Sequence, residues 1–293
     1  MNRKFFYLIV IFSFIIIFSL IYNCGSQETT IKPLTLEERL NLLPANTKDA
    51  VLKDMVLIKG GDFYMGSDIE DPDETPEHLQ TLPDFYLDTK EVTNKDFTEF
   101  IKSTNYKTTS EKQGFAYVYT GEKWDKVQNA NWKARRGEPN SKDWYNHAVV
   151  QVSWFDALAY CEWKHKRLPN EAEWEFSAGG KEHTKWPLGN EFNPDDYSAG
   201  KKFSEPVGLH KANSFGLFDM GGGVWEWTNS LYEFYPYSIK DGREDIKKDG
   251  KRVPRGGSWA NWTTDARVFR CANRSTNGQP DNCYENIGFR CAF

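Results

Sequence analysis

The sequence predicts an irregular α+β fold, in which short antiparallel strands and a few helices are joined by long loops. Its apolar residues are unusually aromatic, with 11 Trp, 14 Tyr and 20 Phe among 293 residues. Large rings favour a loop-rich core over a helical bundle rich in Leu. Short strand patterns bounded by turn residues, and helix starts marked by capping residues, point the same way. No internal repeat or domain boundary interrupts these patterns, so we expect a single domain.

The first residues follow the pattern of a secretory leader. Two basic residues precede an uncharged run at 5–22, which is long enough for a signal peptide or for a membrane span. The sequence IYNCGS around Cys24 resembles the lipoprotein box of bacteria, in which the cysteine is acylated and becomes the new N-terminus. We therefore predict a signal peptide at 1–23 and a lipoprotein anchored to the membrane in the cell envelope, outside the cytoplasm. An uncleaved signal anchor is the alternative.

A tether, residues 24–48, is expected between this anchor and the domain. Thr35 and Glu38 have the spacing of a capping box and predict a short helix that ends before Pro44. The domain itself is predicted to span residues 49–293.

The start of the domain reads as short strands. Residues 55–58 predict a strand, Gly60 and Gly61 a turn, and residues 63–66 its hairpin partner. The acidic segment 68–74 predicts an exposed loop, and residues 82–88 alternate as a further strand.

Three pairs of residues mark helix starts, because a short polar side chain and an acid three positions later can cap the helix reciprocally. The pairs are Thr93 with Asp96, Ser153 with Asp156, and Asn170 with Glu173. The faces expected to point inward are Phe97, Phe100 and Ile101 in the first helix, and Ala157, Tyr160, Cys161 and Lys164 in the second.

The third helix is predicted at 172–178, with Gly179 as its left-handed end. Residues 149–153 predict a strand before the second helix. Residues 102–146, between the first of these helices and the strand at 149–153, have little periodicity and are expected to form a long loop-rich excursion.

Charge and motif content exclude several classes of function. The net charge of −5 becomes about −7 without residues 1–23, which makes nucleic acid an unsuitable partner. The sequence has no Gly-x-Ser-x-Gly elbow, phosphate loop or dinucleotide fingerprint. The histidines do not have the spacing of a helical metal motif. They are His78, His147, His165, His183 and His210.

Several motifs occur in one order along the chain. They are Glu91-Val-Thr-Asn94, the block 167–176, the segments 213–220 and 224–228, Arg255-Gly-Gly-Ser-Trp259, Arg270-Cys-Ala272 and the closing Gly288-Phe-Arg-Cys-Ala292. Together they resemble the formylglycine-generating enzyme family, also called sulfatase-modifying factors. The resemblance covers residues 50–293 and implies a C-type-lectin-like fold with twisted antiparallel sheets and little regular structure.

The family's copper oxidases bind Cu(I) between two cysteines that follow the Gly-Gly-Ser motif. Counted without a gap from Gly256 to Cys271, those two places are held here by Asn261 and Ala266. Cu(I) selects sulfur ligands, and neither an amide nor a methyl group supplies one. Ser258 of the motif is retained, yet copper is not expected as a cofactor.

Four cysteines remain in the predicted extracytoplasmic domain, and their sequence allows three pairings. The family resemblance implies a bridge between Cys161 and Cys271. Cys283 and Cys291 are then available for a second bridge, with two free thiols as the alternative.

Family members also hold structural calcium, partly through an asparagine whose place is taken here by Gly223. Gly223 and Glu226 are therefore weak calcium candidates. Glu226, between two tryptophans, is interpreted as a hydrogen-bonded structural residue; a buried acid with a raised pKa is the alternative.

In the family, the groove beside Gly-Gly-Ser holds an extended peptide. The side chains expected to line or support it here are Ser258, Trp259, Asn261, Trp262, Arg267 and Arg270. Packing in the core is the simpler interpretation for Trp259 and Arg270. We predict a non-catalytic module that binds a peptide or protein; a divergent formylglycine-generating oxidase, or another metal-dependent oxidoreductase of the family, is the alternative.

Overall fold

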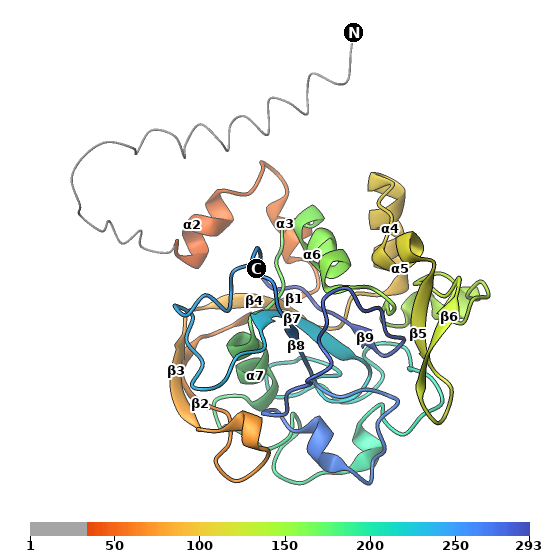
Figure 1. Cartoon of the computed structure of the whole chain (residues 1–293). Helices are drawn as coiled ribbons and strands as arrows, with labels where there is room; N and C mark the ends of the chain where they lie inside the picture. The colour runs from red at the N-terminus through yellow and green to blue at the C-terminus, as the bar shows by residue number, and fades with distance from the viewer. Residues whose placement is uncertain (1–33) are drawn as a thin grey trace. The chain divides into compact units, whose positions relative to one another are not determined.

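A two-stranded ribbon opens the domain in the computed structural model, which describes residues 34–293 (Figure 1). Strand β1 (Met55–Ile58) pairs antiparallel with β4 (Phe85–Asp88), and β2 (Gly61–Met65) pairs antiparallel with β3 (His78–Leu82). The predicted leader and lipidation site lie outside the described residues. Among the described residues, no helix is both long and apolar enough to cross a membrane.

The predicted hairpin between residues 55–58 and 63–66 is wrong, because β1 and β2 follow each other on the same arm of the ribbon. The register is continuous along both arms, so that Ile58 faces Phe85 and Gly61 faces Leu82. A Cβ at Gly60 would lie 2.1 Å from the carbonyl oxygen of Leu82, so this glycine permits the close approach of the arms. The predicted strand at 82–88 is likewise divided, since proline at 83 has no N–H to donate.

Two helices precede the ribbon, α2 (Leu36–Asn41) and α3 (Lys48–Leu52). The compact unit of the structure runs from Leu36 to Phe293. Within it, the guanidinium of Arg39 lies 5.6 Å from the ring centroid of the C-terminal Phe293.

All three predicted capping boxes are present. They open α4 (Asn94–Thr104), α6 (Trp154–Trp163) and α7 (Glu171–Gly179), with both reciprocal hydrogen bonds formed in each. The left-handed residue at the end of α7 is Gly180, with φ of 69°, and not Gly179, which is the last residue of the helix.

The predicted loop-rich excursion contains more regular structure than expected. It holds α5 (Thr109–Gln113), the hairpin of β5 (Phe115–Tyr119) and β6 (Trp124–Gln128), and the 3-10 helix η2 (Lys142–Asn146). The strand predicted at 149–153 does not form, because Gln151 has a left-handed backbone with φ of 58°.

A three-stranded sheet lies at the centre of the domain (Figure 1). Strand β7 (Trp225–Leu231) pairs antiparallel with β8 (Arg252–Arg255) and parallel with β9 (Ile287–Gly288). The fully buried helix α7 packs against β7 and β8 and also against the ribbon strands β2 and β3. The remaining regular elements are the 3-10 helices η1 (Pro72–Glu74), η3 (Pro194–Asp196) and η4 (Ala266–Phe269).

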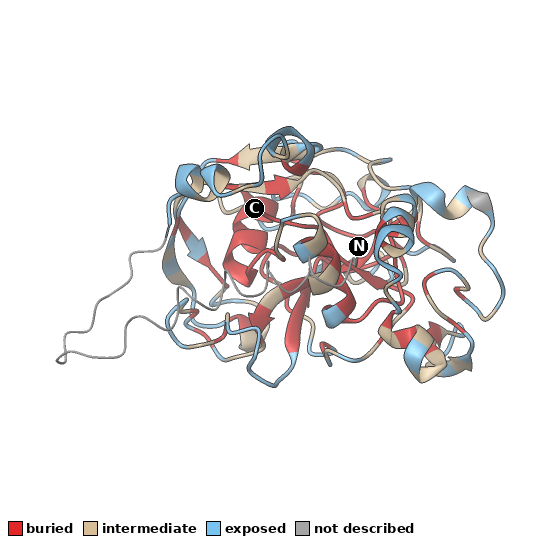
Figure 2. Cartoon of the chain, turned by 90° about the horizontal axis from the view of Figure 1, so that it is seen from above, coloured by how far each residue is buried: buried red, intermediate tan, exposed pale blue. Residues whose placement is uncertain are grey.

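Aromatic rings fill the core, as the composition predicts. Trp154, Trp174, Trp227 and Trp259 are almost completely buried. Buried residues concentrate in the centre of the domain, and exposed residues cover its periphery (Figure 2). The chain ends beside the first ribbon, where Phe293 and Tyr86 exchange two backbone hydrogen bonds of 2.8 and 3.0 Å.

Candidate functional site

Two glycines turn the chain after β8 and deliver Ser258 into the interior. Gly256 and Gly257 have φ values of 102° and 76°, in the region that side chains disfavour. A Cβ at Gly257 would also lie 2.7 Å from the ring of Phe269. The Gly-Gly-Ser motif is therefore a closely packed turn that requires its two glycines, and its Ser258 is completely buried.

Asn261 occupies the first of the two motif positions and closes this turn. The backbone N–H and the Oγ of Ser258 each lie 2.9 Å from Oδ1 of Asn261, and both donate to it. Nδ2 of Asn286 donates to the same Ser258 Oγ at 3.0 Å. Ser258 and Asn261 thus form a satisfied hydrogen-bonded unit that holds the loop in one conformation.

Ala266, at the second position, begins η4. Its side chain is a methyl group, and its carbonyl oxygen accepts a hydrogen bond of 2.9 Å from Nε1 of Trp186. The two positions therefore offer no sulfur, and the oxygen of Asn261 is already used inside the loop. Among residues 34–293, no group of three or more His, Cys, Asp or Glu side chains is placed to hold a metal ion.

A cavity of about 240 Å³ lies beside this loop. Four segments form its wall: the end of β5 with the residues after it, Arg136, the loop at 200–202 and the residues after Ser258. Its lining residues are Tyr119, Thr120, Gly121, Arg136, Gly200, Lys201, Lys202, Trp259, Ala260 and Trp262. Backbone hydrogen bonds from Gly200 to Asn261 and from Lys201 to Trp259, 2.8 and 2.9 Å long, hold two of these segments together.

Two arginines at the cavity, Arg135 and Arg136, share the buried carboxylate of Glu285. Nη2 of Arg136 donates to Oε1 of the buried Glu285 at 3.0 Å and to the carbonyl of Tyr119 at 3.1 Å. The neighbouring Arg135 lies 3.3 Å from the other oxygen of Glu285. Burial lowers the pKa of Arg135 to about 10, which still leaves it charged at neutral pH.

The guanidinium of Arg135 is also enclosed by three aromatic rings. It lies 4.5, 5.0 and 5.1 Å from the ring centroids of Trp144, Phe203 and Trp259. Trp259, which is one of the residues that line the cavity, therefore makes a cation–π contact in addition to its packing in the core.

The structure brings together only part of the predicted groove. Trp259 and Trp262 both line the cavity, and Trp262 is 69% exposed. Ser258 and Asn261 support the loop from inside. Arg267 does not line the cavity, because its exposed guanidinium pairs with Asp265 at 2.8 and 3.0 Å.

Arg270 lies elsewhere and is buried. Its guanidinium forms ion pairs with Glu74 at 2.6 Å and with Asp71 at 2.7 Å. It contributes to a second cavity of about 350 Å³ next to Cys271. The acidic segment that was expected to be an exposed loop is thus anchored, since Glu74 is fully buried against Arg270.

Eight of the ten lining residues were not predicted from the sequence, among them Tyr119, Arg136, Lys201 and Lys202. The signal that the sequence offers is a basic residue next to an aromatic one at Lys202-Phe203. That pattern also occurs on many solvated surfaces, so it could not have selected these positions.

The cysteines do not meet as the resemblance implied. Sγ of Cys161 lies 2.6 Å from Sγ of Cys291, so these two cysteines are the adjacent pair. Cys161 and Cys291 belong to one core cluster, around Phe289, whereas Cys271 belongs to the cluster around α7 and Cys283 to a third. The expected pairs Cys161–Cys271 and Cys283–Cys291 are therefore separated by the packing of the core.

Glu226 is a structural residue. Arg290 donates to both of its carboxylate oxygens at 2.7 Å, and Nε1 of Trp174 donates to one of them at 2.9 Å. Both carboxylate oxygens of Glu226 thus accept hydrogen bonds from neighbouring side chains. The acid closest to Gly223 is instead Glu91, since a Cβ on Gly223 would lie 2.6 Å from its Oε1.

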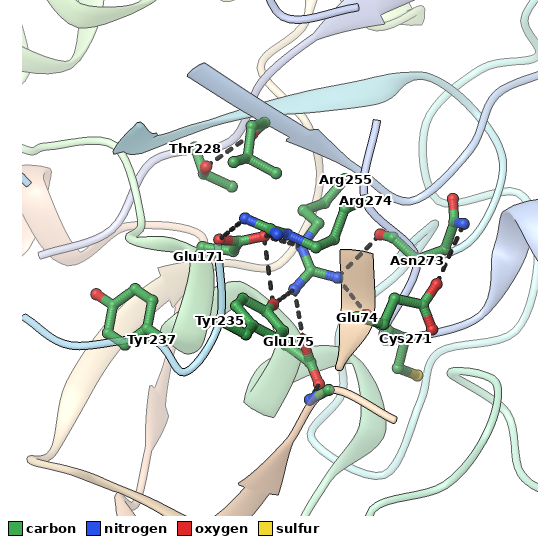
Figure 3. Close-up of polar contacts among 12 residues, drawn as sticks. Glu74, Glu171, Glu175, Thr228, Tyr235, Tyr237, Arg255, Cys271, Asn273 and Arg274 are labelled. Atoms are coloured by element: carbon green, nitrogen blue, oxygen red, sulfur yellow. Dashed lines mark hydrogen bonds and ion pairs between the residues drawn. The ribbon is translucent and has the colours of Figure 1, made fainter. Parts of the chain in front are cut away.

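A buried ion network connects α7 to the sheet and to the C-terminal segment (Figure 3). Nε of Arg255 lies 3.1 Å from Glu171, its Nη2 contacts Glu175, and Nε of Arg274 lies 2.7 Å from Glu171. Side-chain hydroxyl groups and backbone carbonyls complete the network. For example, Arg255 donates a hydrogen bond of 2.8 Å to the carbonyl oxygen of Cys271. This cluster stabilises the fold below the Gly-Gly-Ser loop and is not open to a ligand.

The fold and these motifs define a class of protein. Residues 41–293 match the sulfatase-modifying factor enzyme 1-like domain, and the chain belongs to this family. The predicted C-type-lectin-like α+β fold is confirmed. A solved structure with this fold is PvdO from Pseudomonas aeruginosa, with a TM-score of 0.66 and 25% identity over 83% of this chain and 95% of that one.

Two mouse relatives are equally similar to the chain. The formylglycine-generating enzyme of Mus musculus is 35% identical over 290 residues, which cover 85% of this chain and 77% of the relative. The inactive C-alpha-formylglycine-generating enzyme 2 of the same species is 35% identical over 274 residues, covering 81% and 85%. Overall identity therefore does not decide whether this chain is active, and the decision rests on the residues of the site.

Proposed function

We propose that the chain is a non-catalytic member of the family that binds a peptide or protein segment beside its Gly-Gly-Ser loop. The observation that carries this proposal is the bonding of Asn261. In the place of a copper-binding thiol it accepts two hydrogen bonds from Ser258 and so completes the loop. An amide in this arrangement supports a rigid wall and supplies no soft ligand for Cu(I).

The neighbouring cavity supports the binding part of the proposal. The partly exposed Tyr119 and the exposed Trp262 offer stiff apolar surface in this cavity, where Trp259 is buried, and such side chains anchor partners at interfaces. Trp262 is more than two-thirds exposed although it lies next to a well-packed core. An exposed tryptophan at the edge of a hollow has apolar surface that a partner would remove from water.

The test for catalysis restores the missing sulfur. Asn261→Cys/Ala266→Cys is expected to bind about one Cu(I) per chain, whereas the wild-type domain and the matched control Asn261→Ser/Ala266→Ser bind none. Copper and iron are measured in purified protein, and oxygen uptake is followed with a cysteine-containing peptide. Stoichiometric copper or iron in the wild type, together with oxygen uptake on the peptide, would favour the alternative of a divergent oxidase or another metal-dependent oxidoreductase.

We further propose that the domain is attached to the cell envelope as a lipoprotein through Cys24, on the sequence pattern alone. The full chain is expected to incorporate a fatty-acid label and to sediment with membranes when it is made in a bacterial host. Cys24→Ala should lose the label. A Cys24→Ala chain that stays in the membrane without a shorter N-terminus would instead show an uncleaved signal anchor.

A further inference from the structure

The cavity beside Trp259 is positively charged although the protein as a whole is acidic. Its lining includes the cations Arg136, Lys201 and Lys202, and no Asp or Glu is among its lining residues. The whole chain carries a net charge of −5. A local excess of positive charge in a hollow attracts anionic groups and raises their local concentration.

The nearby carboxylates do not cancel this charge. Glu285 is completely buried and shared between Arg135 and Arg136, so one carboxylate faces two guanidinium groups. Lys201 has one counter-charge, Glu205, at 3.6 Å. Lys202 lies over the ring of Phe203 at 5.5 Å, a contact that leaves its charge uncompensated.

Arg136 is both positioned and accessible. Its two hydrogen bonds to Glu285 and to the carbonyl of Tyr119 are made by Nη2, while 41% of the side chain remains exposed. A guanidinium held on one side in this way can present its other N–H groups to a carboxylate. The cost of ordering the side chain is already met in the free protein, which favours binding.

Arg135 adds a second observation. Only 5% of Arg135 is exposed. Its Nη1 and Nη2 donate no hydrogen bond among the described residues. Its guanidinium lies 5.1 Å from the ring centroid of Trp259, one of the residues that line the cavity, so its charge is next to the cavity wall. The positive charge of this buried guanidinium adds to that of the three lining cations, because burial weakens its screening by solvent.

From this arrangement we infer that the cavity selects an acidic peptide segment, with a carboxylate bound by Arg136 and the two lysines and an adjacent aromatic or aliphatic side chain packed on Trp262. This inference rests on the proposed peptide-binding function and adds the chemical class of the ligand. Trp262 and Tyr119 line the cavity and supply the apolar contact for the peptide. The cations Arg136, Lys201 and Lys202 come from two different segments of its lining. A carboxylate next to an apolar residue satisfies both features.

The test uses eight-residue fluorescent peptides that contain Phe next to Glu, Gln or Lys, each with a free or an amidated C-terminus. The Glu peptide is expected to bind the protein about tenfold more tightly than the Gln peptide, because a hydrogen bond to a charged group typically changes the affinity by about this factor. The Lys peptide should bind most weakly. The amidated series shows whether the carboxylate comes from a side chain or from the chain end. Added salt should weaken binding of the Glu peptide selectively.

Two pairs of matched variants locate the binding site. Arg136→Gln should abolish the preference for Glu, whereas Arg267→Gln, which removes an exposed guanidinium outside the cavity, should leave it unchanged. Lys201→Gln/Lys202→Gln should weaken the Glu peptide by roughly fivefold, with Lys240→Gln/Lys247→Gln as the control for total charge. The lysine variants keep the result interpretable if loss of Arg136 disturbs the buried Glu285.

The outcomes separate the two proposals. Equal affinity for Glu and Gln peptides, with binding that is lost in Trp262→Ala, would overturn the acidic preference and leave peptide binding in place. Equal losses in the cavity variants and in their controls would overturn it as well. If no peptide of any charge binds to the folded protein, the proposed function fails together with this inference.

Discussion

Glu91 is a buried acid whose negative charge is poorly compensated by neighbouring groups. It is 3% exposed, and its Oε2 has no hydrogen-bond partner among the described residues. Burial raises the pKa of Glu91 well above its usual value, and the negative charge of Asp219 raises it further. The nearby Arg290 acts in the opposite direction but is shared with Glu226. Glu91 is thus predicted to hold a proton in the folded protein at pH values where the unfolded chain does not.

Glu91→Gln is expected to make the protein more stable at pH 8 and to change little near pH 4. Because the folded pKa is above the unfolded one, the folded state gains a proton, and stability falls as the pH rises through this interval. A neutral amide removes that dependence. Urea unfolding at pH 4, 6 and 8 with a chelator present measures it. Destabilisation by Glu91→Gln at pH 8, or a calcium-dependent rise in melting temperature that the variant abolishes, would show that a cation and not a proton balances the charge.

Among single residues, those defined by local spacing were predictable and those assembled by the tertiary fold were not. The gap-free count that assigns Asn261 and Ala266 to the two cysteine positions uses only spacing within one segment and stays a prediction. Arg136 reaches the cavity only because it hydrogen-bonds Glu285, almost 150 positions away in the chain, and no local pattern encodes this. The cysteine pairing failed for the same reason, since helix α6 packs Cys161 against Cys291 and not against Cys271.

Helix starts were the elements that the sequence predicted best, because a capping box is a local structure. Asn170 at the start of α7 accepts a hydrogen bond of 2.7 Å from the N–H of Glu173, and the carboxylate of Glu173 accepts one of 2.9 Å from the N–H of Asn170. Strands were harder to predict. The break at Pro83 follows from the missing N–H of proline, whereas the close approach of the arms at Gly60, where a Cβ would lie 2.1 Å from the carbonyl oxygen of Leu82, is revealed only by the three-dimensional pairing.

Asn170→Ala should cost about 1 kcal/mol of unfolding free energy, the usual effect of removing a capping side chain. The loss is expected toward the upper end of the usual range of about 0.5–2 kcal/mol. The reason is that α7 is buried along its whole length, so water does not replace the lost cap at its first N–H groups. Equilibrium urea unfolding measures the change. Asn277→Ala, at an exposed position, is the control and should stay within about 0.5 kcal/mol of wild type. Equal effects of the two substitutions would contradict a capping role.

At the scale of the whole molecule, one buried ion network joins segments that the chain places far apart (Figure 3). Glu171 and Glu175 come from α7, Arg255 from the end of β8 and Arg274 from the C-terminal segment. Glu175 also accepts a hydrogen bond of 2.7 Å from the N–H of Gly66, at the end of the ribbon. The Gly-Gly-Ser loop begins at the residue after Arg255, so this network sets the position from which the loop and its cavity are built.

Arg255→Met is therefore expected to destabilise the domain by about 3–5 kcal/mol at pH 7, because it leaves buried carboxylates without their partner. Burial by itself would raise the pKa of Glu171, but Arg274 and Arg255 together lower it below its usual value. A lowered pKa contributes stability above the unfolded value of about 4.3, and this contribution is lost as the pH falls through the folded pKa. The difference between Arg255→Met and wild type should accordingly narrow below pH 4 in urea unfolding. Arg267→Met, at the exposed pair with Asp265, serves as the control and should show neither the loss nor the narrowing. A difference that stays constant from pH 7 to pH 3 would mean that Arg255 acts through packing against Trp174, and that charge is not what holds the sheet, α7 and the ribbon in register.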